Sequence, residues 1–124
     1  MPVETTSKAV GILGERLAFS YLRKRGYKIL LANYVSPVGE IDLVARDGSS
    51  LVFVEVKTRR SEAMGVPAES VTFRKRRQIV KAAQYYLKEY NLFDRDCRFD
   101  VVSIYLFSET EPRIELIQNA FNVE

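Results

Sequence analysis

The chain has 124 residues, of which 47% are hydrophobic and 28% are charged, a balance typical of a folded domain rather than a disordered chain. No Pro- or Gly-rich linker interrupts it, so residues 1–124 are expected to form a single domain. It contains no histidine and Cys97 is its only cysteine, which excludes Ser/His/Asp and Cys/His nucleophilic sites and any ordinary zinc site within the chain. Chemistry, if present, depends on carboxylates, Lys, Arg and Tyr.

Three further absences bear on location. Apolar runs fall well short of the roughly 20 residues that a membrane helix needs. The N-terminus lacks the basic start and continuous apolar segment of a secretory signal, and the lone cysteine permits no internal disulfide. These features predict a cytoplasmic protein without a membrane partner.

The net charge of +3 is modest but unevenly distributed. Residues 57–81 carry eight basic and two acidic side chains, which leaves the rest of the chain net acidic. This asymmetry favours a polyanionic partner such as nucleic acid, although a solvated basic surface would give the same pattern.

Apolar residues at three- and four-residue spacing predict a first helix over Ser7–Arg25, ended by Gly26. A short buried strand is expected over Lys28–Tyr34. Glu40–Ala45 and Leu51–Thr58 then form a predicted hairpin, with its turn around Asp47 and Gly48.

Residues 61–71 are expected to form a loop with one helical turn, and Thr72 can cap a second helix that runs to about Tyr90. Phe99–Phe107 and Arg113–Ile117 are predicted as two further strands. The predicted order is αβββαββ. Arg98 and Asp100 share one face of their strand and are expected to pair with each other or to support a site.

Charged residues occupy the predicted hairpin, where strand interiors usually exclude them. Because side chains alternate along a strand, Glu40 and Asp42 are expected to share one face, as are Glu55 and Lys57. A four-residue loop over residues 47–50 would place Asp42 opposite Glu55. The same register would place Glu40 opposite Lys57, whereas a two-residue turn would place Glu40 opposite Glu55.

Either register brings two carboxylates within about 5 Å, which is destabilising unless a cation or a shared proton lies between them. Asp42 and Glu55 therefore suit Mg²⁺ (or Mn²⁺), which one or two carboxylates hold together with water and phosphate. Lys57 would stand beside the metal-bound water and stabilise developing charge. The alternative is a surface salt bridge between Glu55 and Lys57, with Asp42 solvated.

The pattern of Ile41-Asp42 followed by Glu55-Val56-Lys57 resembles the PD-(D/E)xK nuclease superfamily, with Ile41 in place of that superfamily's proline. The chain as a whole is similar to the YraN-like family of small bacterial proteins, predicted endonucleases that resemble archaeal Holliday junction resolvases. The matching segments are Gly14-Glu15, Gly26-Tyr27, Asn33, GEIDLVA, VFVEVKTR and Arg98-Phe99-Asp100-Val101-Val102.

The resemblance implies an α/β fold with a restriction-endonuclease-like core, a mixed central sheet flanked by two helices. It implies that Asp42 and Glu55 bind the metal and that Lys57 is the catalytic lysine. Glu15 would correspond to the first-helix acid of the resolvase-like branch, with Gly11, Gly14 and Ala18 allowing close approach of helix and sheet. A homodimer is expected by analogy.

A basic cluster surrounds the expected start of the second helix. Its members are Arg59, Arg60, Arg74, Lys75, Arg76 and Arg77. Cations are unfavourable at a helix N-terminus unless an anion binds there, so these residues are predicted to contact a DNA backbone. A solvated basic face is the alternative.

Together these features predict a metal-dependent endonuclease that hydrolyses phosphodiesters in structured or branched DNA. The second hypothesis is a catalytically weak or inactive nucleic-acid-binding protein of the same fold that acts with a partner. The sequence does not distinguish a DNA substrate from RNA.

Overall fold

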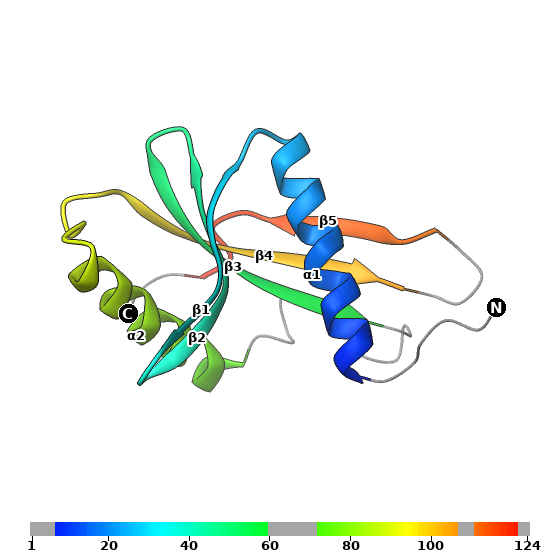
Figure 1. The fold of residues 1–124 in the computed structure, drawn as a ribbon, viewed down its shortest axis with the longest axis horizontal. Coiled ribbons are helices and arrows are strands. Elements are labelled where there is room, and N and C mark those ends of the chain that lie inside the picture. Colours follow the sequence, from blue (N-terminus) through cyan, green and yellow to red (C-terminus); the bar gives the residue numbers. More distant parts are fainter. Residues whose placement is uncertain (1–6, 60–71, 107–110, 122–124) are drawn as a thin grey trace.

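A computed structural model describes residues 7–59, 72–106 and 111–121 (Figure 1). Its elements, in chain order, are α1 (Ser7–Lys24), β1 (Lys28–Ser36), β2 (Gly39–Asp47), β3 (Ser50–Arg59), α2 (Phe73–Glu89), β4 (Cys97–Tyr105) and β5 (Arg113–Ile117). The predicted αβββαββ order is confirmed. The loop predicted for residues 61–71 lies outside the described residues.

Local signals set most element boundaries. Gly26 has a φ of 93°, a conformation that favours glycine and ends α1. The Thr72 side chain accepts a hydrogen bond from the Lys75 backbone N–H at 3.2 Å, which confirms the predicted cap of α2. β4 begins two residues earlier than predicted, because Cys97 already pairs with Leu51 of β3.

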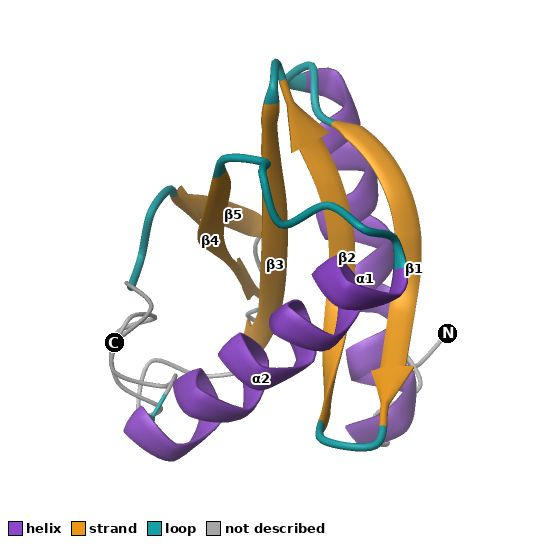
Figure 2. Ribbon diagram, turned by 90° about the vertical axis from the view of Figure 1, so that its left-hand side faces the viewer, coloured by secondary structure: helices purple, strands orange, loops and turns teal. Residues whose placement is uncertain are grey.

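The five strands form one mixed sheet in the order β1-β2-β3-β4-β5. β3 and β4 are parallel and are joined through α2, while the other neighbours are antiparallel. The two helices cover opposite faces of the sheet, α1 over β1, β3 and β4 and α2 over β1 and β2 (Figure 2). This is the arrangement expected of a restriction-endonuclease-like core.

The alternation of side chains along β3 supplies both hydrophobic layers. Phe53 packs in the layer under α2 with Ile79 and Tyr86, and all three are buried. Val52 and Val54 point the other way and pack under α1. Burial on both faces explains why β3 is almost continuously apolar until Glu55.

No helix among the described residues is both long and apolar enough to span a bilayer.

A polar network around Asp100 of β4 connects segments that are far apart in the chain. Arg98 donates to both carboxylate oxygens of the fully buried Asp100, from Nε at 2.9 Å to Oδ1 and from Nη2 at 3.0 Å to Oδ2. Nη2 also reaches Asp47 at 2.9 Å, and the Tyr27 hydroxyl donates to Asp100 Oδ2 at 2.8 Å. The expected pairing of Arg98 with Asp100 is confirmed, and the network has a structural role.

Gly14 sets the distance between α1 and β3. A Cβ atom at this position would lie 1.9 Å from Oγ1 of Thr58, so the helix backbone sits directly on that side chain. Ala18, one turn later, is fully buried. The predicted close approach is confirmed at these two positions but not at Gly11, where an added Cβ would have no neighbour within 4 Å.

We expect Gly14→Ala to lower the free energy of unfolding by about 1–3 kcal/mol, because overpacking at this contact forces α1 away from the sheet. Gly11→Ala is the matched control on the same helix. It meets open space and removes a flexible residue, so it should leave stability unchanged or raise it by up to about 1 kcal/mol. Urea unfolding of the two variants measures the difference, and equal effects would contradict the contact.

Candidate active site

The β2–β3 hairpin has the register of the four-residue-loop prediction. Arg46 pairs with Leu51, and the ladder closes one residue further, with Asp47 opposite Ser50. The alternative register, with a two-residue turn at Asp47-Gly48, is therefore wrong, because the residues between the paired strands are Gly48 and Ser49. The ladder ends at Leu43 opposite Val54, so the predicted continuation that pairs Glu40 with Lys57 is wrong as well.

β2 leaves β3 beyond this point, while β3 continues beside β4 to Arg59 (Figure 2). The regular alternation of β2 breaks at the same place. Ile41 packs under α2 whereas Leu43, two residues later, packs under α1. The neighbouring strand β1 carries Asn33 with a φ of 55° here. A simple two-residue alternation therefore does not describe how Asp42 is oriented.

Asp42 lies where the two strands separate. Its Oδ2 accepts a hydrogen bond of 2.8 Å from the backbone N–H of Val56. The carboxylate thereby satisfies a β3 donor beyond the end of the β2–β3 ladder. This bond fixes Asp42 next to Glu55, as predicted, through a side chain rather than through backbone pairing.

Glu55 is buried, with 4% of its surface exposed. Burial, followed by a side-chain hydrogen bond to Asp42 and the charge of Asp42, raises its pKa from 4.5 to about 8. The positive charges of Lys75 and Lys57 oppose this rise. In the metal-free chain Glu55 therefore keeps its proton at neutral pH, which is one of the two ways to relieve like charges at this distance.

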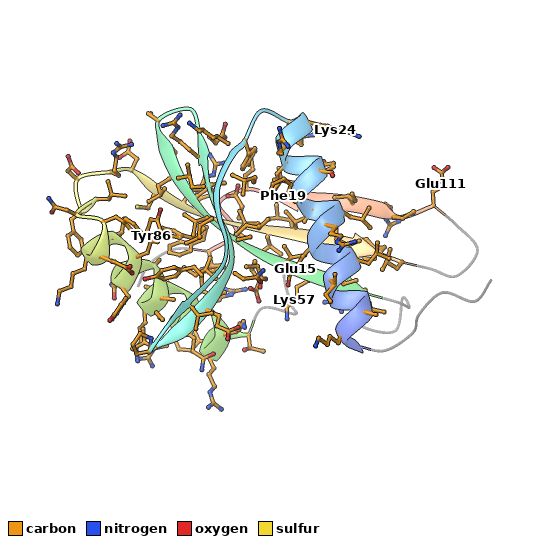
Figure 3. The ribbon with its side chains drawn as sticks, viewed as in Figure 1. Glu15, Phe19, Lys24, Lys57, Tyr86 and Glu111 are labelled. Atoms are coloured by element: carbon orange, nitrogen blue, oxygen red, sulfur yellow. The ribbon has the colours of Figure 1, made fainter. Side chains whose placement is uncertain are left out.

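Glu15 approaches the same place from α1. Its pKa is raised by burial and then by the negative charge of Asp42, while a hydrogen bond from the Asn33 side chain opposes the rise. It borders a cleft of about 500 Å³ that Arg16 and Asn33 also line. Figure 3 shows Glu15 and Lys57 near the crossing of α1 and β3, where Gly14 contacts Thr58.

Three predicted acids thus converge on the gap between β2 and β3, Glu15 from the α1 face and Glu55 from the α2 face, with Asp42 between them. Within the described ranges, no three His, Cys, Asp or Glu side chains are gathered closely enough to form a ready-made metal cage. Two carboxylates with hard oxygen donors still suit Mg²⁺ or Mn²⁺, which normally keep several waters and bind substrate phosphates. The donor set at Asp42 and Glu55 fits such an ion.

The basic residues of α2 do not act as one cluster. Lys75 points inward, with Nζ 3.7 Å from Oε2 of Glu55. The Arg76 guanidinium lies over the Phe121 ring, 5.6 Å from its centroid. Arg74 and Arg77 are exposed. Together with Phe73, Gln78 and Lys81 they line a shallow groove of about 290 Å³.

The prediction that Arg59 contacts DNA as part of an exposed basic cluster is wrong. It is buried, with 3% of its surface exposed, at the end of β3 where the strand pairs with Tyr105 of β4. It therefore does not belong to an exposed basic surface. Arg60 lies outside the described residues.

The sequence prediction missed two members of the site, Lys75 as a partner of Glu55 and Asn33 as a donor to Glu15. A signal for Lys75 was present. It precedes Ile79 by four residues, which places it on the buried stripe of α2 rather than on the solvent face. Asn33 has no such periodic signal, since its orientation depends on a local change in strand conformation.

Two solved structures show similarity to this chain. The first is the Holliday junction resolvase Hjc of Archaeoglobus fulgidus, with a TM-score of 0.48 and 18% identity over 84% of this chain and 74% of the resolvase. The second is EndoMS in a complex with double-stranded DNA, with a TM-score of 0.45 and 20% identity over 88% of this chain and 40% of EndoMS. Both scores lie below 0.5, and we assign no function from them.

Relatives at the sequence level are much nearer. A UPF0102 protein of Geobacter sulfurreducens is 48% identical and covers 99% of this chain and 98% of its own length. A UPF0102 protein of Geobacter metallireducens is 50% identical over 94% of this chain and 95% of its own length. Residues 14–104 match the model described as uncharacterised protein family UPF0102. The chain therefore belongs to the UPF0102 family, the YraN-like family that its motifs resemble.

Proposed function

We propose that this protein is a metal-dependent endonuclease that hydrolyses phosphodiester bonds in structured or branched DNA. The observation that carries the proposal is the pair of carboxylates, Asp42 and Glu55, held together between two diverging strands with Lys57 and Lys75 beside them. A generic hairpin would not hold two acids so close at this depth. The PD-(D/E)xK resemblance of the same residues adds to it.

Asp42 and Glu55 would hold Mg²⁺ or Mn²⁺. The ion, when bound, would polarise the phosphate and lower the pKa of an attacking water. Val56 fixes Asp42 through its backbone N–H, so this ligand needs little reorganisation. Glu15, close to Asp42, would orient a water molecule or accept a hydrogen bond from water that the ion holds.

Lys57 follows Glu55 by two residues, and its charge acts on that carboxylate. In the proposed reaction its ammonium stabilises the negative charge that develops on the phosphate. The exposed Arg74 and Arg77 would contact phosphates of the flanking DNA. Such contacts weaken as salt concentration rises and do not depend on the base sequence. We further propose a cytoplasmic location and, because cutting a two-fold junction needs two sites, a homodimer.

A second candidate is a nucleic-acid-binding protein of the same fold with little turnover that acts with a partner. The observation that favours it is the lack of a preformed three-ligand cage within residues 7–59, 72–106 and 111–121. DNA binding would then depend on the basic residues of α2, and Asp42 and Glu55 would have a structural role.

Cleavage assays with purified wild type and Asp42→Ala separate these candidates. Labelled four-way junction, flap, linear duplex and single-stranded DNA, with a matching RNA, are incubated with Mg²⁺ or Mn²⁺. We expect structure-selective cleavage that falls about a hundredfold or more in Asp42→Ala, because the variant loses a metal ligand. DNA binding should persist or strengthen, since a negative charge near the phosphate is gone.

The matched control is Glu115→Ala, which removes an exposed acid from β5. It should cleave like wild type. Equal trace activity in wild type and Asp42→Ala would indicate contamination, and DNA binding without any cleavage would favour the second candidate.

A further inference from the structure

Lys75 is a basic residue that the structure places in direct contact with Glu55, one acid of the pair. Its Nζ lies 3.7 Å from Oε2 of Glu55, and its side chain is 40% exposed against 5% for that of Glu55. The cap from Thr72 fixes the Lys75 backbone at the start of α2. A solvent-accessible ammonium on an anchored backbone therefore reaches a buried carboxylate.

Lys75 reaches Glu55 from α2, whereas Lys57 lies on the same strand as the acid. Its ammonium therefore lies against one of the two side chains that the sequence predicted as ligands of a divalent ion.

A divalent ion on Glu55 and an ammonium at 3.7 Å from the same carboxylate would repel each other. We propose that Lys75 substitutes for the divalent ion in the metal-free protein and is displaced when the ion binds, which frees its ammonium to contact a substrate phosphate. This inference rests on the proposed function, because it assumes that the acid pair binds metal.

The freed Lys75 ammonium would join other positive charges at the start of α2. Arg74 and Arg77 are already exposed there, in the groove that Phe73, Gln78 and Lys81 also line. Within the first turn of α2, backbone N–H groups without intrahelical partners also favour an anion. Occupation of the metal site should therefore raise DNA affinity through Lys75, and by thermodynamic reciprocity DNA should raise metal affinity.

Titration calorimetry with Mn²⁺ in the absence of DNA tests whether Lys75 competes with the ion for Glu55. The variants are Lys75→Met, the charge-retaining Lys75→Arg, the exposed-lysine control Lys88→Met on the same helix, and Asp42→Asn. Lys75→Met should bind Mn²⁺ about two- to fivefold more tightly than wild type, the range expected for loss of a partly exposed ion pair. Lys75→Arg and Lys88→Met should stay close to wild type.

Fluorescence anisotropy with a labelled four-way junction, in EDTA and then in Ca²⁺, tests whether the freed Lys75 contributes to DNA binding. Wild type and Lys88→Met should gain affinity when Ca²⁺ is added, and Lys75→Met should lose most of that gain. Urea unfolding of each variant in EDTA checks that all of them are folded at the assay temperature.

Unchanged or weaker Mn²⁺ binding by a folded Lys75→Met, while Asp42→Asn abolishes binding, would overturn the displacement and leave the metal site standing. A Ca²⁺-dependent gain in DNA affinity that survives in Lys75→Met would also overturn it. Mn²⁺ binding that is absent from wild type, or indifferent to Asp42→Asn, would refute the metal site and this inference together.

Discussion

Glu55→Gln is expected to abolish cleavage and at the same time to stabilise the metal-free protein at pH 8. Glutamine keeps the shape of the side chain and a hydrogen bond to Asp42 but cannot ionise. The wild-type carboxyl has a pKa raised from 4.5 to about 8 by burial and by Asp42. The folded protein therefore holds a proton that the unfolded chain releases between these two pH values.

The sign of the pH dependence follows from this difference. Because the native state binds more protons than the unfolded state, the free energy of unfolding falls as pH rises from 4.5 toward 8. The stability from the protonated Glu55 is fully present below pH 4.5 and is lost above about 8. Over that window the loss is on the order of a few kcal/mol.

Urea unfolding in EDTA at pH 5, 6.5 and 8 measures the effect. The stability advantage of Glu55→Gln over wild type should grow at each step, whereas Glu115→Gln, which alters an exposed acid on β5, should follow wild type. Added Mn²⁺ should then stabilise wild type and leave Glu55→Gln unchanged. Parallel pH profiles for wild type and Glu55→Gln would contradict the raised pKa of Glu55.

Asp100→Ala is expected to cause a loss of about 3–5 kcal/mol in the free energy of unfolding, the range for removing one partner of a buried ion pair. Asp100 is fully buried and accepts from Arg98, from the Tyr27 hydroxyl and from the backbone N–H of Asn119. Its removal leaves the Tyr27 hydroxyl and the Asn119 N–H without this acceptor, while Arg98 keeps its bond to Asp47. The connections from β4 to the end of α1 and to the segment after β5 would be lost together.

Asp94→Ala is the control, since Asp94 is an exposed acid shortly before β4. Chemical denaturation should show a large fall for Asp100→Ala and a change within about 0.5 kcal/mol for Asp94→Ala. A loss below about 1 kcal/mol in Asp100→Ala would mean that water replaces the carboxylate, and that the network contributes little.

The sequence determined the features that depend on near neighbours in the chain. Alternating and three-to-four-residue periodicities predicted the element order, Gly26 and Thr72 marked helix ends, and the expected hairpin register predicted that Asp42 and Glu55 lie close together. A short loop fixes the pairing of its two strands, which is why two acids thirteen positions apart could be placed together from the sequence alone.

Only the tertiary structure decided how these residues are used. Ending the β2–β3 ladder at Leu43 lets Asp42 bond the Val56 backbone and reach both Glu55 and Glu15. The rotation of α2 against the sheet turns Lys75 inward while Arg74 and Arg77 stay exposed. Arg59, at the end of β3 beside Tyr105 of β4, is buried. Each outcome depends on contacts between segments far apart in the chain, which local spacing and charge do not encode.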